Sequence, residues 1–404
     1  MNNGPVSQRA QGIMNAGTYR LVVDYFVNTY RKNVLESSDV ADFTFGNPHE
    51  MPLQGFVDAL QTWSVPRNKD WFGYKNSEPH AQTVVANSLQ RMLGMPFEPN
   101  DIAMTTGGFA AITAALKAVT DPGDEVIYSL PPWFSYEPLC AEAGVSPVKV
   151  TIDLETFDLD LGAIEQAITD RTRVVIVNTP HNPTGKVVPA ETLTRLAQIL
   201  EDASRRIGRR IYLVADEAYN RIVFDGIEYH SPLEFYPYSF MAYSYGKTLL
   251  APGQRMGYVA MPPTMPVEQR EALREGLSAI QFGSGFLFPN ALLQHAIGDL
   301  EGLRLDVDHL QQKRDHMVDA LREMGYEMHR PEGTFYLFPK PPIADDRAYA
   351  DVLIEENVAV LPGTLFETPG YFRICLTAND DMIERGLPGF RRAIERTTEV
   401  KAGS

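Results

Sequence analysis

Apolar positions along the chain follow two spacings, which indicate helices and strands. Residues 18–35 carry apolar side chains at helical spacing, and residues 43–46 predict a short strand that enters a turn. From about residue 80 the two patterns alternate. The expected strands are 102–105, 125–129, 173–178 and 211–215, and the expected helices among them are 81–93, 109–119 and 190–206. This alternation predicts an α/β fold in which helices cover both faces of a mostly parallel sheet.

The pattern changes near residue 300. A long helical stretch at 306–324 is followed by three short apolar segments that predict the strands of a smaller α+β unit. These segments are residues 333–338, 359–361 and 372–376. We therefore expect a large domain at residues 50–305 and a small C-terminal domain at 306–404. The N-terminal segment, residues 1–49, is expected to pack with the small domain.

The composition narrows the classes of protein that this sequence can encode. Hydrophobic residues make up 44% of the 404 residues, enough for a large core, which argues against a disordered chain. The formal net charge is −16, because 52 Asp and Glu residues face 36 Lys and Arg residues. Non-specific nucleic-acid binding depends on Lys and Arg, so this acidic chain argues against it. The histidines are scattered without ligand spacing, so we expect no metal site.

The number of cysteines and the length of the apolar stretches indicate the cellular compartment of the protein. The chain holds two cysteines, Cys140 and Cys375, too few for a disulfide framework, which favours a reducing cytoplasm. The sequence has no apolar run of about 18 residues, the length that suggests a membrane span. Its first residues also lack the apolar core of a signal peptide. We therefore expect a soluble cytoplasmic protein with no membrane partner.

Four segments place chemically useful side chains directly after a predicted strand, where ligands bind in open α/β sheets. They are residues 105–110 (TTGGFA), 178–185 (NTPHNPTG), 216–219 (DEAY) and 244–247 (SYGK), the last followed by Arg255. In the first, two glycines let N–H groups approach an anion at a helix N-terminus. In the last, Lys247 lies among small and aromatic residues, and partial desolvation favours a neutral, nucleophilic amine.

Each segment also has an ordinary structural interpretation. The glycines serve a tight turn, and Asn182 bonds its own backbone in an Asx turn. On this interpretation, Asp216 would cap the following turn or pair with an arginine, and Lys247 would be an exposed surface residue. Taken one at a time, the segments leave these alternatives open.

Taken together, the four segments resemble fold-type I pyridoxal-phosphate enzymes, specifically the class I/II aminotransferases. The order and the separations match from about Phe43 to Thr377, which is most of the chain. Trp133 in the stretch PPWFSY and Arg373 in the late segment YFRICLT also match the family pattern. The resemblance implies a fold-type I transferase with pyridoxal 5′-phosphate as its cofactor.

The resemblance implies roles around the cofactor ring. Lys247 would form the internal aldimine and later move the proton between Cα and the cofactor. Asp216 would keep the pyridine nitrogen protonated, which makes the ring an electron sink. Tyr219 and Asn182 would hydrogen-bond the phenolic oxygen, and Trp133 would stack on the ring.

The resemblance also implies how the phosphate is bound. Ser244, Arg255 and the N–H groups of Gly108 and Phe109 would hold it within one chain. Tyr74 matches the tyrosine that reaches the phosphate of the neighbouring subunit. A homodimer with shared active sites is therefore implied.

The substrate end of the site would hold the α-carboxylate. Arg373 would clamp it with two parallel hydrogen bonds, and Asn182 and the backbone of Gly46 would lie beside it. Dicarboxylate-specific relatives place an arginine for the distal carboxylate where this chain has residues 281–290 (QFGSGFLFPN). Because this stretch holds three phenylalanines and no arginine, we expect neutral, aromatic or bulky side chains to be accepted better than aspartate.

Two further positions depart from the family pattern. Pro79 stands where relatives commonly have glycine five residues after the equivalent of Tyr74, which weakens the assignment of that tyrosine. Phe109 is bulkier than the small or polar residue common at its position, so the phosphate loses one side-chain contact.

The function implied is transfer of the α-amino group of an amino acid to a 2-oxo acid by a ping-pong mechanism. Another pyridoxal-phosphate reaction on this fold, such as β-elimination, decarboxylation, or an oxidative or cyclising step, would use the same residues. A non-catalytic sensor would need a DNA-binding domain of roughly 60–80 residues before the sheet. Only about 45 residues precede Gly46, and they carry no basic recognition helix.

Overall fold

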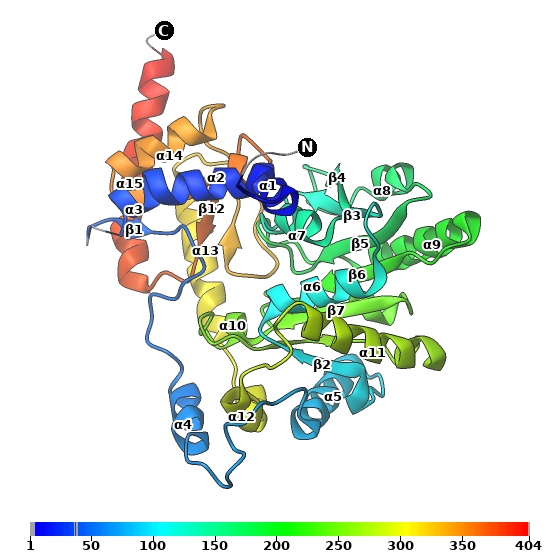
Figure 1. The fold of residues 1–404 in the computed structure, drawn as a ribbon. Helices are drawn as coiled ribbons and strands as arrows, with labels where there is room; N and C mark the ends of the chain where they lie inside the picture. Colours follow the sequence, from blue (N-terminus) through cyan, green and yellow to red (C-terminus); the bar gives the residue numbers. More distant parts are fainter. Residues whose placement is uncertain (1–4, 36, 38, 403–404) are drawn as a thin grey trace.

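A seven-stranded sheet forms the centre of the computed structural model, which describes residues 5–35, 37 and 39–402 (Figure 1). The strands are β2 (Ile102–Thr105), β3 (Glu125–Leu130), β4 (Ser146–Thr151), β5 (Thr172–Asn178), β6 (Tyr212–Asp216), β7 (Ser239–Ser244) and β8 (Gly257–Ala260), in the order β2-β8-β7-β6-β5-β3-β4. Strand β8 is antiparallel to both of its neighbours, and the other pairs are parallel. The predicted α/β fold is confirmed.

Helices bury both faces of this sheet, as the continuous apolar strands require. In β5, Val174 and Ile176 face α6 (Gly108–Val119), α7 (Tyr136–Ala143) and α11 (Val267–Gly283). Val175 and Val177 face the opposite side. That side is covered by α5 (Pro79–Leu93), α8 (Leu161–Ala167), α9 (Ala190–Ile207) and α12 (Ala291–Gly302), with α4 (Gln54–Trp63) packed on α12.

The C-terminal part has an apolar core of its own. Its helices are α13 (Val307–Glu323), α14 (Asp346–Glu355) and α15 (Asp380–Ala402). Strands β9 (Tyr336–Leu337), β11 (Leu361–Pro362) and β12 (Phe372–Cys375) form an antiparallel sheet in the order β11-β12-β9, and β1 (Ala41–Asp42) pairs in parallel with β10 (Val358–Ala359). The domain boundaries at residues 49 and 305 stay a prediction.

The N-terminal helices lie against both parts of the chain (Figure 1). They are α1 (Gln8–Asn15), α2 (Gly17–Tyr25), the π-helical turn η1 (Phe26–Tyr30) and α3 (Arg31–Asn33). Thr18 donates from its backbone N–H and its hydroxyl group to Glu137 Oε2 on α7, at 3.1 and 3.2 Å. Tyr25 donates at 2.7 Å to the carbonyl oxygen of Val360, between β10 and β11. Contacts with the small domain are therefore only part of this packing.

Two expected strands, one in the N-terminal segment and one in the small unit, were wrong in detail. The strand expected at residues 43–46 lies at 41–42, because the Asp42 carboxylate accepts from the N–H of Thr44 at 2.9 Å and turns the chain. The strand expected at 359–361 is two strands: β10 pairs with β1, and β11 pairs with β12. Edge strand β4 had no prediction, because its sequence SPVKVT is largely half-exposed and lacks a clear apolar run.

Among the helices that the structure describes, none is long and apolar enough to cross a membrane.

Candidate active site

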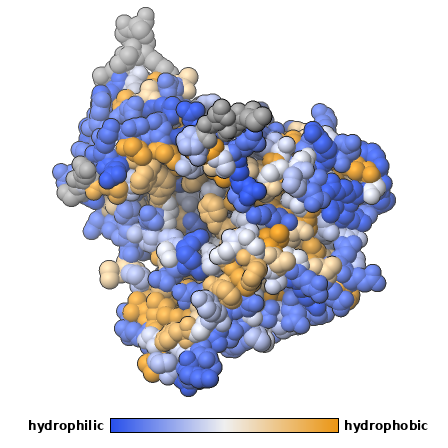
Figure 2. All heavy atoms as spheres, viewed as in Figure 1, coloured by the Kyte–Doolittle hydropathy of each residue, from blue (hydrophilic) through white to orange (hydrophobic). Residues whose placement is uncertain are grey.

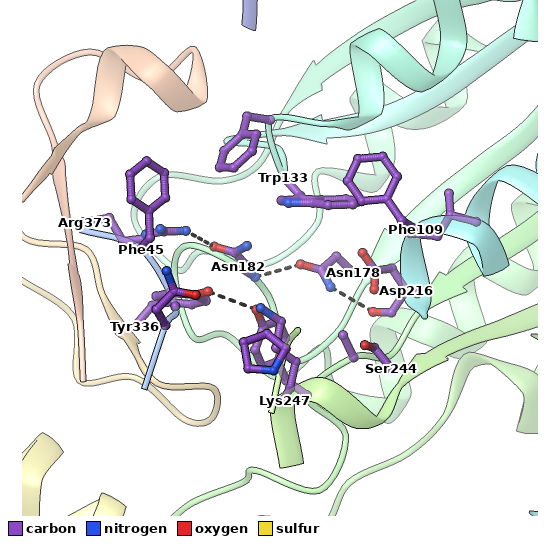
Figure 3. A pocket seen from close by; sticks show the side chains of 18 of the residues that line it. Phe45, Phe109, Trp133, Asn178, Asn182, Asp216, Ser244, Lys247, Tyr336 and Arg373 are labelled. Carbon is purple, nitrogen blue, oxygen red and sulfur yellow. Dashed lines mark hydrogen bonds between the residues drawn. The ribbon is translucent and has the colours of Figure 1, made fainter. Parts of the chain in front are cut away.

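A cavity of about 250 Å³ lies beside the carboxyl ends of β5, β6 and β7 (Figure 3). It brings together all the site residues expected from the sequence except Tyr74. These lining residues are Gly46, Gly108, Phe109, Trp133, Asn182, Asp216, Tyr219, Ser244, Lys247, Arg255 and Arg373. They come from the large unit, the small unit and the loop after β1, so the site is formed only when these parts pack together.

Asp216 is a buried acid at the end of β6. Its Oδ2 accepts a 2.6 Å hydrogen bond from the hydroxyl group of Tyr136. Burial raises the pKa of Asp216 to about 6, while the hydrogen bonds from Tyr136 and from the backbone of Ala218, and the charge of Lys247, act in the opposite direction. A cation in the cavity would stabilise the ionised form of this buried carboxyl group. A protonated pyridine nitrogen would be such a cation.

Lys247 lies on α10 (Tyr245–Thr248), directly after β7. Its Nζ is 5.7 Å from the centroid of the Tyr219 ring and 5.8 Å from that of Phe335. Gly46 passes close to the same atom, because a Cβ built on Gly46 would lie 3.6 Å from Nζ and 3.1 Å from the hydroxyl oxygen of Tyr336. Glycine at this position therefore leaves the space beside the amine open for a reactant.

The start of α6 forms a cradle for an anion. Gly107 has φ +93°, and a Cβ there would lie 2.7 Å from Nη2 of Arg255. A Cβ on Gly108 would lie 3.2 Å from Cβ of Ser244. The carbonyl oxygen of Pro252 accepts from Nη1 of Arg255 at 2.7 Å and holds this guanidinium in place. A helix N-terminus, a guanidinium and a hydroxyl group within one corner are the donors that a phosphate group requires.

Arg373 on β12 forms the opposite end of the cavity. Its Nη1 donates to Oδ1 of Asn182 at 2.9 Å, and its Nη2 donates to the carbonyl oxygen of Thr44 at 2.8 Å. Its Cζ lies 4.2 Å from the centroid of the Tyr336 ring. Nε is buried with no hydrogen-bond partner among the described residues. The guanidinium is thus fixed in orientation and keeps donor capacity for a carboxylate.

A continuous hydrogen-bonded path joins Arg373 to Asp216 (Figure 3). From Asn182, the backbone N–H donates to Oδ1 of Asn178 at 2.7 Å. From Asn178, Nδ2 donates to the carbonyl oxygen of Asp216 at 2.8 Å. Asn178 had no predicted role, although its place at the end of a predicted strand was a usable signal.

Tyr336, Phe45 and Phe134 carried no signal in the sequence, although Tyr336 contacts the predicted residue Tyr219. The hydroxyl oxygens of Tyr219 and Tyr336 are 3.0 Å apart, and burial is the main cause that raises the pKa of Tyr219 well above its ordinary value. Tyr336 comes from β9 of the small unit, and Phe45 and Phe134 also line the cavity. Only long-range packing brings these side chains to the site.

Tyr74 lies outside this cavity. Its side chain is 88% exposed, and its ring lies 4.8 Å from the ring of Phe288. Within its own chain, Tyr74 therefore faces solvent and does not contact the cradle at the start of α6.

Comparison with known proteins identifies the family. Residues 38–388 match the family described as aminotransferase class I and II. The chain belongs to this aminotransferase family. It is 32% identical over 366 residues to an aspartate/prephenate aminotransferase of Thermus thermophilus, and the match covers 89% of this chain and 92% of that protein.

Solved aminotransferase structures have the same fold. An amino transferase from Eubacterium rectale superposes with a TM-score of 0.88 at 28% identity, covering 97% of this chain and 99% of that one. The aspartate aminotransferase from Thermus thermophilus with maleate gives 0.83 at 27% identity, covering 96% and 100%. The predicted family and enzyme class are confirmed, and members of this family use pyridoxal phosphate.

Proposed function

We propose that this aminotransferase moves the α-amino group of an amino acid to a 2-oxo acid in two half-reactions, with pyridoxal 5′-phosphate as the amino-group carrier. The observation that carries the proposal is the meeting of Lys247, Asp216 and Arg373 in one cavity. These side chains supply an amine, a buried acid and a carboxylate-binding cation. That set is what the chemistry at the Cα of an amino acid requires.

The residues present fit the cofactor at each end. Gly108, Phe109, Ser244 and Arg255 would hold the phosphate group, where the glycines leave room at the start of α6. Asp216 would face the pyridine nitrogen. When bound, the cofactor supplies an electron sink for the charge that develops at Cα.

Tyr219 and Asn182 would bind the phenolic oxygen of the cofactor, and Trp133 would cover the ring. The Trp133 indole already meets the ring of Phe109 edge-on at 4.7 Å. Both aromatic side chains line the cavity, so they would also exclude water from one face of the bound ring.

Lys247 and Arg373 would act on the substrate. Arg373 orients the α-carboxylate, which fixes the direction of the Cα–H bond. Lys247 would hold the cofactor through Nζ, and the same amine would accept the proton from Cα as a general base. In the second half-reaction the same residues would act in reverse on the 2-oxo acid.

We also propose a homodimer with shared active sites. Tyr74 is exposed in its own chain, and a symmetric dimer would let it reach the phosphate group of the other subunit. Ser244 and Arg255 would contact the same phosphate group from within the subunit that holds it.

The test is a comparison of products with and without an amino acceptor. Purified holoenzyme is incubated with a panel of amino acids, first alone and then with 2-oxoglutarate or pyruvate. Transfer of the amino group to the added oxo acid supports the proposal. Release of ammonia, carbon dioxide or peroxide without transfer would replace it with another reaction of the same cofactor.

A further inference from the structure

An apolar groove opens directly beside the active-site cavity. Its residues are Val22, Val23, Phe26, Tyr30 and Leu35 of the N-terminal segment, together with Phe45, Asn47 and Phe134. The last three also line the cavity that holds Lys247 and Arg373. Figure 2 shows hydrophobic side chains over α2, beside the hollow between the two parts of the molecule. The groove and the cavity are therefore neighbours that share one wall.

Aromatic rings form the wall that leads from the cavity into the groove. Phe45 directly precedes Gly46, which borders the amine of Lys247. The Tyr30 ring meets Phe45 edge-on at 5.0 Å, and Phe26 stacks on Tyr30 at 5.5 Å. This wall extends outward from the reacting amine along η1.

The groove leaves apolar surface in contact with water. Phe26 and Val23 are each 41% exposed, and Leu35 is 58% exposed. Exposed apolar side chains that cluster beside a binding site favour the burial of an apolar ligand group.

The distribution of charge within the chain disfavours a second acidic group on the ligand. None of the residues that line the groove is charged. The cations that line the cavity are Lys247, Arg255 and Arg373. The proposed function assigns these three to the cofactor aldehyde, the phosphate group and the α-carboxylate. No cation among the described lining residues is left for a distal carboxylate.

We infer that this groove holds the side chain of the amino-acid substrate, and that this side chain is large and apolar. The inference rests on the proposed function, because it places the substrate α-carboxylate on Arg373. Phe45 and Phe134 then contact the part of the side chain nearest Cα, and Val22 and Phe26 contact its far end. The groove residues thus set the specificity of the enzyme.

The first test compares substrates and unreactive analogues on the holoenzyme. A pocket that buries even one more methylene discriminates by about tenfold or more, so kcat/KM for phenylalanine and norleucine should exceed that for alanine and aspartate by at least that factor. Calorimetry should show tighter binding of 3-phenylpropanoate than of succinate. Both analogues offer a carboxylate to Arg373 and neither has an amino group, so this measurement does not depend on turnover.

The second test uses paired substitutions in the N-terminal segment. Val22→Asp places a carboxylate in the groove and should weaken 3-phenylpropanoate binding and lower the phenylalanine-to-alanine ratio of kcat/KM, each by about tenfold. Val27→Asp is the matched control, because Val27 is 46% exposed and does not line the groove. It should leave both quantities unchanged. Val22→Arg should instead improve binding of succinate.

Three other results would count against these proposals. Two of them would refute the inference about the groove, and the third would refute the proposed function. Succinate binding as tight as 3-phenylpropanoate, with no response to Val22→Asp, would show that the side chain lies elsewhere. An equal loss for alanine and phenylalanine together with a changed oligomeric state would show that a second copy of the chain covers the groove. Failure of every amino acid to donate its amino group would refute the proposed function, while the calorimetric comparison would still decide whether the groove binds apolar groups.

Discussion

The hydroxyl group of Tyr136 donates a 2.6 Å hydrogen bond to Oδ2 of Asp216, and both side chains are buried. Tyr136 begins α7 and Asp216 ends β6, so the bond joins a helix that covers the sheet to the centre of the sheet. The bond stabilises the ionised carboxylate and so lowers the pKa of Asp216. Burial acts in the opposite direction and raises this pKa.

Tyr136→Phe should therefore shift the pH dependence of the enzyme. Loss of the hydrogen bond raises the pKa of Asp216 further, so more of this acid is protonated at slightly acidic pH and fails to hold a protonated pyridine nitrogen. The ratio of kcat/KM near pH 6 to that near pH 8 should fall. Tyr128→Phe is the matched control, because the buried hydroxyl group of Tyr128 has no hydrogen-bond partner among the described residues. Equal ratios in the two variants would contradict this role of Tyr136.

Gly107→Ala should weaken cofactor binding. The new Cβ would lie 2.7 Å from Nη2 of Arg255 and would displace the guanidinium from the cradle. A hydrogen bond to a charged group contributes about 1.5–3 kcal/mol, so the dissociation constant measured by fluorescence titration should rise by about tenfold or more. Gly123→Ala imposes a similar backbone strain at φ +94° with no atom within 4 Å. It should lower stability and leave cofactor affinity intact; an equal loss of affinity in both variants would assign the effect to strain.

Lys247 should carry the cofactor covalently. Borohydride reduction of the yellow holoenzyme should fix the pyridoxyl group on the peptide that contains Lys247, as read by mass spectrometry. Lys247→Ala should retain some cofactor through the phosphate cradle but lose turnover by several orders of magnitude, because the nucleophile and the general base are the same group. A label on another lysine would end this assignment.

Two impaired variants should restore activity when they share a dimer. In a mixed dimer of Lys247→Ala and Tyr74→Ala, the Tyr74→Ala subunit keeps its own lysine and receives Tyr74 from its partner, so one site is whole. Activity after subunit exchange should exceed that of either parent. A mixture of Lys247→Ala with Arg373→Ala is the control, since both residues line the cavity of one chain and no whole site can form. If exchange is proven and the first mixture also gains nothing, Tyr74 acts within its own chain.

Stability of the cofactor-free protein should fall between about pH 4.5 and pH 7 through Glu217. This carboxyl group is buried and accepts from Tyr229, Ser231 and Asn220 at 2.5, 2.7 and 3.3 Å. Burial raises its pKa from 4.5 to about 7. The folded state therefore binds the proton more tightly than the unfolded state. This contribution to stability is fully present below about pH 4.5 and is lost as the pH rises through about 7.

Glu217→Gln removes the titrating group while it keeps a similar shape. The decline of the melting temperature across this pH range, followed by calorimetry, should be shallower in the variant than in the wild type. Glu228→Gln is the control, since Glu228 is the exposed carboxylate nearest in sequence to this network. Parallel curves for the wild type and Glu217→Gln would show that Glu217 is not held protonated.

Four strands of the sheet could be predicted because they are short, apolar runs buried on both faces, whereas β7 and β8 are as buried but had no prediction. Strands β2, β5 and β6 begin and end within one residue of their expected positions. In β5, for example, alternate side chains face the two layers of helices, so the whole strand is apolar. The edge strand β4 is largely half-exposed and lacks an apolar run, and the pairing of β1 with β10 joins segments distant in sequence. No local pattern carries that information.

Some residues of the candidate site could be predicted from the sequence, and others could not. Asn182 and Asp216 follow strands predicted with bounds, and Lys247 follows β7, which had none, so the order of the strands brings all three to one edge of the sheet. Tyr336 and Phe45 reach the cavity only because a second unit packs over that edge. The groove beside Phe45 could not be foreseen, because it forms where the N-terminal helices meet residues far along the chain.

The path from Arg373 through Asn182 and Asn178 ends on the backbone carbonyl oxygen of Asp216, and we expect it to couple the occupancies of the two ends of the cavity. Coupling between two binding events is reciprocal. Whatever factor a bound cofactor applies to the affinity for a carboxylate, the carboxylate applies the same factor to the affinity for the cofactor. A substitution at Asn178, midway along the path, should therefore change both affinities together. Retention of the cofactor then becomes a function of substrate concentration as well as of the cradle that holds the phosphate.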